Sequence, residues 1–426
     1  MRMRRGGKGW APVAVLSAAM AVSALVHAQI PFERAVQDLG SPDVSTRLRT
    51  VQLLKDAAYA EAAVPLAPLI TDSNDDVQLA AIAAELNIFM AEPIATRRKV
   101  GLVVEVRTPI AAEAAFSAGP LILGPRQVPP EVFDGLRAAC RDDNARVRLE
   151  AIYAFGALAS EPVGARRREL LRAAGPDVGA MIGAVDPAHR YAALRVLGRV
   201  FDVRPGDEPV EPLVGDAVVG ALNDKEDAMR AVAMDALGAM RYERAVPGLT
   251  ELYSYYKRGD MAERTFASLA RIAHPTSADL FTNALADRDP VIRRLAVEGI
   301  ARIGDKARLG AVQGAMATER IDAVLLAERF AEARLADGPI DPLVEALTRA
   351  KSREQARGYL SELAAAGRAA VIASRLQDPE PQLRLDLVDS LALSYQPSAA
   401  SLVKALQNDP DARVAKAVQR ALARLQ

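Results

Sequence analysis

One stretch, DRDPVIRRLAVEGIARIG from Asp287 to Gly304, recurs along the chain. The apolar residue before its first arginine aligns the copies, at Val77, Val147, Met229, Ile292, Leu383 and Val414. Weaker copies lie near Val44, His189, Ala262 and Ala323, and one more lies within residues 352–365. Several neighbouring copies are 30 to 33 residues apart. A period of this length indicates a stack of small units rather than one globular core.

Within a copy the apolar residues follow a helical period. Ile292, Ala296, Ile300 and Ile303 form one stripe of a 3.6-residue helix. The preceding Asp-x-Asp-Pro is typical of a helix start, because Asp caps free backbone N–H groups and Pro is tolerated in the first turn. A second helix is predicted after each copy, opened by Ala-Val-Pro-x-Leu as in RYERAVPGLTELYSYY. Each unit is thus predicted to be a helix–turn–helix.

The composition agrees with an all-α chain. Half of the residues are hydrophobic but only 4% are aromatic, which favours small side chains between close helices over a β-sheet core. A chain of 426 residues would ordinarily divide into domains. Stacked repeats are not bound by that limit, because each unit contacts only its neighbours.

The pattern Asp…Val-Arg-x-x-Ala-x-x-Ala-Leu-Gly, followed by Ala-Val-Pro-x-Leu, resembles short bacterial HEAT repeats of the phycobilisome-lyase type. The resemblance covers about Pro31 to Gln426. It implies a right-handed α-solenoid of about eleven or twelve repeats. In such a superhelix we expect the second helix of each unit to form the concave wall and to offer side chains to a partner.

Four pairs of charged residues stand six positions apart, with the Asp before a helix and the Arg on its first turn. They are Asp142 and Arg148, Asp224 and Arg230, Asp287 and Arg293, and Asp378 and Arg384. The resemblance implies a structural ladder, in which each Arg reaches the turn acid of an adjacent unit. Gln78 and Ala415 occupy the Arg position in two copies, and Lys257 with Glu263 reverses the charges in another.

The pattern breaks in two places. Residues 94–130 are interpreted as a degenerate repeat with ATRRKVGLVVEVR as its first helix and a long loop at 119–130; a binding insertion is the alternative. The segment from Asp202 to Pro212 is predicted to be a solvated loop, because it is rich in Pro, Gly and acidic residues.

Two departures from the repeat are candidate partner-binding residues. The first is the cluster Tyr253, Tyr255 and Tyr256 with Lys257 and Arg258; the second is the basic segment Arg97, Arg98 and Lys99. Tyrosines are enriched at interface hot spots. Tyr253 and Tyr256 are expected to share a helix face while Tyr255 points elsewhere.

The first 28 residues are predicted to be a signal peptide. The basic MRMRRGGK precedes the apolar APVAVLSAAMAVSALV, and small residues precede a cut after Ala28. The solenoid would then span residues 29–426, in the periplasm or outside the cell. Removal of four basic and no acidic residues from the 54 of each leaves a net charge near −4. Because both signs are interspersed, nucleic acid is not expected as a partner.

No motif of enzyme chemistry is visible. The sequence shows no phosphate-binding loop, nucleophile elbow, HExxH helix or paired cysteine site. Cys140 is expected to be a small buried residue, and His189 and His274 to be helix-end or partly packed side chains. No catalytic residue, cofactor or metal is therefore expected.

The sequence as a whole favours an exported, non-enzymatic scaffold that binds a protein partner on the solenoid surface. The resemblance leaves a lyase-type role in chromophore attachment as the alternative, against which the predicted export argues. A structural or carbohydrate-associated protein of the cell envelope is a third possibility, although the mature chain lacks Trp and offers few aromatic platforms.

Overall fold

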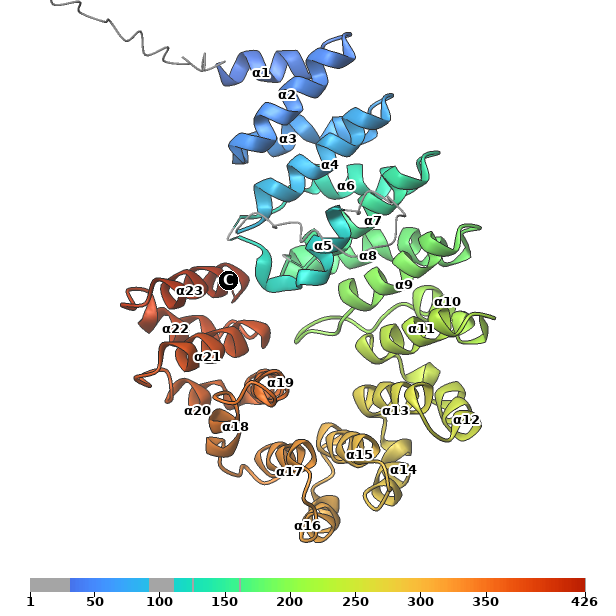
Figure 1. The fold of residues 1–426 in the computed structure, drawn as a ribbon, viewed down its shortest axis with the longest axis vertical. Helices are drawn as coiled ribbons and strands as arrows, with labels where there is room; N and C mark the ends of the chain where they lie inside the picture. The colour runs from blue at the N-terminus through green and yellow to red at the C-terminus, as the bar shows by residue number, and fades with distance from the viewer. Residues whose placement is uncertain (1–30, 92–110, 125, 161, 426) are drawn as a thin grey trace, which may run out of the picture.

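The computed structural model describes residues 31–91, 111–124, 126–160 and 162–425. In this part of the chain, 22 α-helices pack as eleven successive pairs, and α5 (Ala111–Ala118) is additional to them. The pairs stack side by side in two rows that curve into a ring, with the first pairs projecting from it (Figure 1). The fold is therefore an all-α solenoid, as the repeat predicts.

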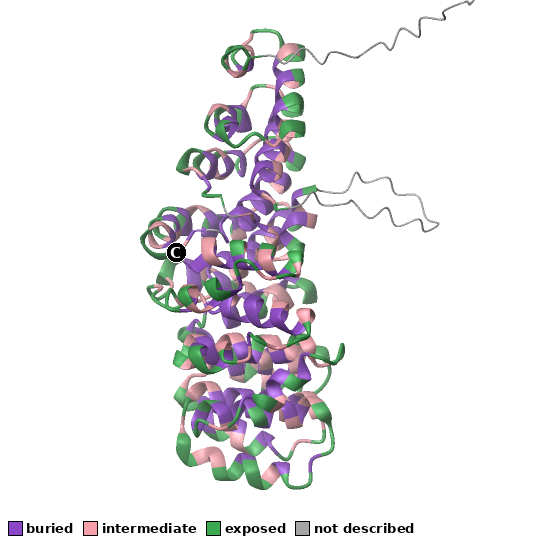
Figure 2. Cartoon of the chain, turned by 90° about the vertical axis from the view of Figure 1, so that its left-hand side faces the viewer, coloured by how far each residue is buried: buried purple, intermediate pink, exposed green. Residues whose placement is uncertain are grey.

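The first helix of each pair belongs to one row: α1 (Phe32–Leu39), α3 (Ala63–Leu66), α6 (Pro130–Ala139), α8 (Gly164–Ala180), α10 (Pro212–Gly220), α12 (Val246–Tyr256), α14 (Ala278–Ala284), α16 (Leu309–Met316), α18 (Asp341–Ala346), α20 (Ala369–Ala373) and α22 (Ala399–Val403). The second helix belongs to the other: α2 (Val44–Ala57), α4 (Asp75–Phe89), α7 (Ala145–Leu158), α9 (Pro187–Val200), α11 (Asp227–Ala239), α13 (Asp260–Ile272), α15 (Pro290–Ile303), α17 (Asp322–Leu335), α19 (Arg353–Leu363), α21 (Pro381–Leu393) and α23 (Ala412–Leu425). The core lies between the rows along the whole stack (Figure 2).

Helix α15 shows why the repeated stretch folds as it does. The Asp289 carboxylate accepts a hydrogen bond from the Val291 N–H at 2.8 Å, and Pro290 begins the helix. Gly304 ends it with φ 82°, a left-handed conformation that glycine adopts without strain. The stripe residues Ile292, Ala296 and Ile300 are buried, as predicted from their spacing.

The glycine of the repeat brings neighbouring helices close together. A Cβ atom added to Gly299 would lie 2.6 Å from the Phe281 ring, which is itself fully buried on α14. We expect Gly299→Ala to lower the free energy of unfolding by about 1–3 kcal/mol, because the ring or the helix must move to admit the methyl group. Urea unfolding measures this. Gly310→Ala is the control, because an added Cβ there meets no atom within 4 Å; equal effects of the two changes would contradict the packing argument.

The row of repeated helices faces the centre of the ring. The Ala-Val-Pro helices, which were predicted to be the second helix of each unit and which come first in each pair here, form the outer row. Figure 1 shows α13, α15 and α17 on the inner side and α12, α14 and α16 on the outer side. Side chains two pairs apart also meet there: Arg302 on α15 contacts Glu362 on α19. This contact passes the intervening α17 on the inner side of the curve, where successive helices of the row converge. The prediction for the concave wall was therefore wrong, because both helices of a unit carry an apolar stripe and the stripe does not show the direction of curvature.

The ladder arginines have two kinds of contact. Nη1 of Arg148, Arg230, Arg293 and Arg384 donates to the backbone carbonyl oxygen of the Asp six residues earlier, at 2.8, 2.5, 2.9 and 2.8 Å. The same side chains also reach the next unit. Arg293 Nε lies 2.7 Å from Glu319, and Arg384 Nε lies 2.8 Å from Asp409. Arg148 lies 3.9 Å from Asp186, while Arg230 donates to the Tyr256 hydroxyl at 2.9 Å.

The segment interpreted as a degenerate repeat is not a member of the stack in its described part. Helix α6 follows the turn Ala67–Thr71 directly in the outer row, and α4 packs against α7 in the inner row. Helix α5 lies outside both rows, against α7. Residues 111–129 are thus part of an insertion, because no position in either row is left for them. The helix expected at ATRRKVGLVVEVR lies in residues 92–110, outside the described part.

The predicted long loop at 119–130 is largely fixed by backbone contacts. A short 3₁₀ turn spans Pro120–Ile122. The Ala91 N–H donates to the Ile122 carbonyl oxygen, and the Gly124 N–H donates to that of Phe89, both at 2.8 Å. The chain just before the insertion and the end of the insertion therefore lie side by side.

The loop from Asp202 to Pro212 is present and mostly exposed, but two of its charged residues anchor it to the stack. Arg204 is 6% exposed and donates to the carbonyl oxygens of Ser160 and Pro162, both at 3.1 Å. Asp207 accepts hydrogen bonds from the fully buried Arg167 at 2.9–3.0 Å. The prediction of a solvated loop therefore holds for the exposed positions 205, 206, 208, 209 and 211, but not for Arg204 and Asp207, whose partners lie in the preceding part of the stack.

The last helix pair closes the ring against the insertion. Arg424 on α23 donates to the Pro120 carbonyl oxygen, 304 residues away in sequence. The Arg204 guanidinium lies 4.0 Å from the centroid of the Tyr395 ring. We call this contact region the seam. Within the described residues, none of the helices is long and apolar enough to cross a membrane.

Candidate interaction surface

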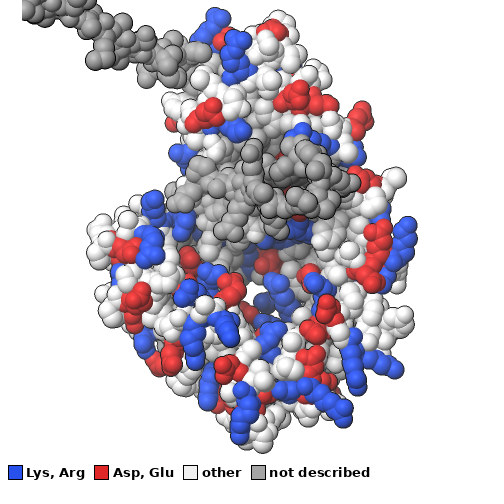
Figure 3. All heavy atoms as spheres, in the orientation of Figure 1, with Lys and Arg blue, Asp and Glu red and all other residues white. Residues whose placement is uncertain are grey.

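The concave wall contains an open cavity of about 640 Å³, lined by α9, α11, α13 and the end of α5. Its polar lining consists of Tyr191, Arg195, Arg199, Asp202, Asp235, Arg264 and Arg271. Basic side chains surround the hollow at the centre of the ring, with acidic side chains between them (Figure 3). We call the surface formed by these residues and Phe116 the concave site.

Helix α5 is attached to the wall by charged groups. The Glu150 carboxylate accepts hydrogen bonds from the N–H groups of Ala111 and Ala112 at 3.0 and 2.9 Å, at the positive end of the helix. Burial raises the pKa of Glu150, while these two N–H groups act in the opposite direction. Arg195 contacts Glu113 at 2.5 Å and lies 5.2 Å from the centroid of the Phe116 ring. The insertion thus covers part of the wall and forms one side of the concave site.

Arginines outnumber carboxylates in the concave site. Arg271 pairs with Asp202 at 2.8 Å, and Arg264 pairs with Asp235. Arg199 instead donates to the Phe116 carbonyl oxygen at 3.3 Å and lies 4.7 Å from the Phe116 ring centroid. Burial lowers the pKa of Arg199, and the charge of Arg195 lowers it further. This balance of charge suits a partner that brings its own acidic groups.

Beyond the concave site, the wall carries a buried ionic network. Arg302 forms two hydrogen bonds to Glu362, each 2.9 Å long, and the Tyr359 hydroxyl donates to Glu298 at 2.6 Å. Burial alone would lower the pKa of Arg302, but the charges of Glu362 and Glu298 outweigh it and raise the pKa. The Tyr359 ring stacks on Phe330 with centroids 4.4 Å apart. These groups satisfy one another and hold α15, α17 and α19 together.

Asp389 on α21 makes stability depend on pH. Burial raises its pKa to about 6, and the negative charge of Asp386 acts in the same direction. The positive charges of Arg420 and Arg357 oppose this shift; Arg357 Nη1 lies 3.9 Å from Asp389 Oδ2. The folded state therefore holds this proton more tightly than the unfolded chain. The raised pKa of Asp389 contributes fully to the stability of the folded state below about pH 4, and this contribution is lost as pH rises through about 6.

We expect Asp389→Asn to be more stable relative to the native chain at pH 8 than at pH 4, by at most about 3 kcal/mol. Urea unfolding at both pH values measures the difference, with Asp134→Asn on the exposed side of α6 as the control. A stability difference that does not change with pH would contradict the assignment.

The tyrosine cluster lies on α12, in the outer row. Tyr255 is 76% exposed, whereas Tyr253 packs on the buried Phe266 with ring centroids 4.8 Å apart. Tyr256 accepts the hydrogen bond of Arg230 and forms an edge contact with Tyr255. Lys257 and Arg258 follow the helix and are exposed. Tyr253 and Tyr256 thus face the solenoid while Tyr255 faces outward, and the cluster is remote from the concave site in the two-row arrangement.

The other predicted residues are dispersed. Arg97, Arg98 and Lys99 lie outside the described residues. Cys140 is buried, and burial raises the pKa of its thiol to about 12. Burial and the charge of Arg148 lower the pKa of His189. His274 Nδ1 lies 2.8 Å from the Thr276 hydroxyl, at the start of a short turn. In the described ranges, no group of three or more His, Cys, Asp or Glu side chains is placed to hold a metal ion.

Sequence reasoning missed the concave site. Its arginines lie on the repeated helices, which were expected to face away from the concave side. A usable signal was present: Arg195 and Arg199 are four positions apart, and Arg264 and Arg271 are seven apart, so each pair shares one helix face. No comparable local signal places α5 over α7 and α9.

No model of a protein family matches the chain, and no curated protein matches it either. Many solved structures do match. An engineered protein is 18% identical with a TM-score of 0.42, covering 92% of this chain and 98% of its own. The complex of CpcE and CpcF of phycocyanin lyase from Nostoc sp. PCC7120 is 21% identical with a TM-score of 0.41, covering 55% of this chain and 94% of the matched chain.

A computationally designed armadillo repeat protein for modular peptide recognition is 16% identical with a TM-score of 0.38, covering 57% of this chain and 99% of the designed chain. The matches include a second designed armadillo repeat protein. The chain itself, by its own eleven helix pairs, is an α-solenoid of this general form.

Proposed function

We propose that this protein is an exported, non-enzymatic scaffold that binds an acidic segment of a protein partner in its concave site. The observation that carries the proposal is the concave site itself, an open cavity of about 640 Å³ on the inner wall in which arginines exceed carboxylates. An extended concave wall lets a solenoid assemble affinity from many weak contacts along its partner. Acidic groups of a partner would complete the charge balance around Arg199, beside which Arg264 and Arg271 already have carboxylate partners.

The solenoid fold supports the choice of a protein partner, because such folds are typical of protein-binding scaffolds. Phe116 and Tyr191 at the cavity add aromatic contact area beside the charges, which is the usual composition of an interface hot spot. The acidic groups here are engaged in ion pairs with arginines, which supports a structural rather than a catalytic use.

The test begins with capture of partners from a cell-envelope fraction and continues with a purified partner by isothermal titration calorimetry. We expect the double variant Arg264→Glu and Arg271→Glu to weaken binding about a hundredfold, because it places like charges against acidic groups. Arg288→Glu, on an exposed turn, is the matched control. Unchanged affinity of the folded double variant would remove the concave site as the place of binding.

The tyrosine cluster on the outer face is the second candidate surface. Tyr255→Ala is expected to change the free energy of unfolding by less than about 0.5 kcal/mol, because the side chain is 76% exposed. A loss of partner affinity without a loss of stability would therefore place binding on the outer face. Tyr253→Ala should instead destabilise the chain, because its ring packs on Phe266.

Export is tested separately from binding. The leader-like segment supports cleavage after Ala28, so the mature protein recovered from cells should begin at or near Gln29. Amino-terminal sequencing reads this directly. Recovery of the chain with Met1 intact would refute cleavage but would leave the binding proposal standing.

A further inference from the structure

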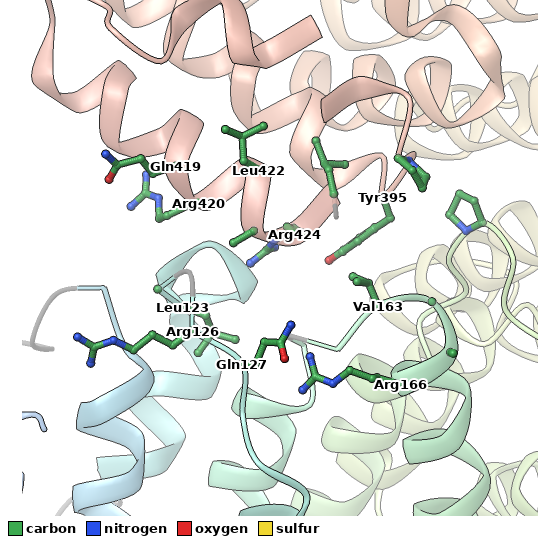
Figure 4. Close-up of a pocket in the computed structure, with 17 residues that line it drawn as sticks. Leu123, Arg126, Gln127, Val163, Arg166, Tyr395, Gln419, Arg420, Leu422 and Arg424 are labelled. Atoms are coloured by element: carbon green, nitrogen blue, oxygen red, sulfur yellow. The ribbon is translucent and has the colours of Figure 1, made fainter. Parts of the chain in front are cut away.

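The seam contains a second cavity, distinct from the concave site. It has a volume of about 690 Å³ and lies between the insertion and the start of α8 on one wall and α23 with Tyr395 on the other. Figure 4 shows Arg424 and the Tyr395 hydroxyl pointing toward Gln127 and Arg166 on the opposite wall. Segments from distant parts of the sequence therefore meet around one space.

The lining of this seam cavity is basic. Its charged members among the described residues are Arg126, Arg166, Arg420 and Arg424, and neither Asp nor Glu is among them. Gln127, Gln419 and Tyr395 supply neutral polar groups, and Leu123 and Leu422 supply apolar surface. The guanidinium groups of Arg420 and Arg424 suit an oxyanion, because their N–H donors match carboxylate and phosphate geometry. On the opposite wall Arg126 and Arg166 donate to backbone carbonyl oxygens and add positive charge to the cavity.

Two of these arginines retain unused hydrogen-bonding capacity in the described structure. Arg424 is 7% exposed; its Nη2 donates to Pro120, while its buried Nη1 has no hydrogen-bond partner. The buried Nε of Arg420 also has none. A buried unsatisfied donor on a charged group is costly, which makes a ligand that accepts from it favourable.

The pKa of Tyr395 also indicates an excess of positive charge in the seam cavity. Burial alone would raise the pKa of this phenol, but the charges of Arg204 and Arg424 outweigh burial and lower it. An acceptor bound beside the hydroxyl would relieve the repulsion among these arginines.

We propose that the seam cavity is a binding site for a small oxyanion ligand, a carboxylate- or phosphate-bearing molecule held between Arg420 and Arg424 on α23 and the wall that carries Arg166. This cavity is separate from the proposed concave site, because the two share no lining residue. The ligand would add contacts between the two walls of the seam.

The test uses isothermal titration calorimetry of the full chain at low salt, with citrate as the carboxylate probe and inorganic pyrophosphate as the phosphate probe. We expect one site, and we expect its Kd to rise about tenfold or more in Arg420→Gln, because a charge-assisted hydrogen bond is lost. Arg424→Gln should have at least the same effect. Whichever probe binds more tightly identifies the source of the oxyanion.

Arg420→Gln is the decisive variant. Arg420 makes none of the described hydrogen bonds or ion pairs, whereas Arg424→Gln also removes the contact to Pro120. Because the charge of Arg420 acts on the buried Asp389, urea unfolding must first show that Arg420→Gln is folded. Arg49→Gln, on an exposed position of α2, controls for a general change of charge. Absence of binding by both probes, or equal affinity in the native chain and in Arg420→Gln, would overturn the proposal.

Discussion

Replacement of Arg167 by Met is expected to lower the free energy of unfolding by about 3–5 kcal/mol, because it leaves a buried carboxylate without its partner. Arg167 is 1% exposed. Its Nε and Nη2 donate to both oxygens of Asp207, and Nη2 also donates to the carbonyl oxygens of Val200 and Asp202 at 2.9 and 3.0 Å. The side chain thus fixes the loop that separates α9 from α10.

A matched control lies on the same helix. Arg172 pairs with Glu208 at 3.4 Å, and the two side chains are 66% and 65% exposed. Arg172→Met should change the free energy of unfolding by less than about 1 kcal/mol, because water screens the pair. Urea unfolding of both variants makes the comparison, and a loss of similar size in the two would contradict the role assigned to burial. Adding Asp207→Leu to Arg167→Met should recover part of the loss, since it removes the stranded charge.

Replacement of Phe281 by Ala is expected to cost a similar amount, about 3–5 kcal/mol, because it leaves a cavity between α13, α14 and α15. The ring is fully buried and forms an edge contact with Phe266, with centroids 5.4 Å apart. The loss should be local, since each pair in a solenoid is stabilised by its neighbours. Hydrogen exchange should therefore speed up in residues 260–303 before it does in α21 and α23.

The control for Phe281→Ala is Val371→Ala on α20, also in the outer row, where the side chain is 43% exposed. It should change the free energy of unfolding by less than about 0.5 kcal/mol. Uniform acceleration of exchange across all eleven pairs would show that the stack unfolds as one unit, contrary to this expectation.

Local chemistry explains why much of the fold could be predicted. The bounds of α15 follow from Asp289 and Pro290 before the stripe and from Gly304 after it, all of which act within a few residues. The same signals recur before α9 and α21, where a Pro again opens the helix. A repeated local pattern implies repeated pairs, and the all-α solenoid follows from it.

The remaining features depend on geometry that no local pattern contains. The direction in which the stack curves decides that Arg195 and Arg264 face the concave site, and it results from small rotations between successive pairs. The placement of α5 depends on Glu150 and Arg195, which lie on α7 and α9. The seam joins Arg424 to Pro120 across 304 residues, a separation at which sequence periodicity carries no information.

Because the ring is closed at the seam, the distance between the two sides of the seam depends on the shape of the whole stack. In an open solenoid the ends move freely, so a slight change of angle between two pairs has little effect elsewhere. Here the angles of every pair from α8 to α23 add up at one place, where Arg204 must still meet Tyr395. A partner that tightened or relaxed the wall by a small amount per pair would displace the two sides of the seam by the accumulated sum. A partner bound at the concave site would therefore strain the seam, and a ligand bound in the seam cavity would strain the inner wall.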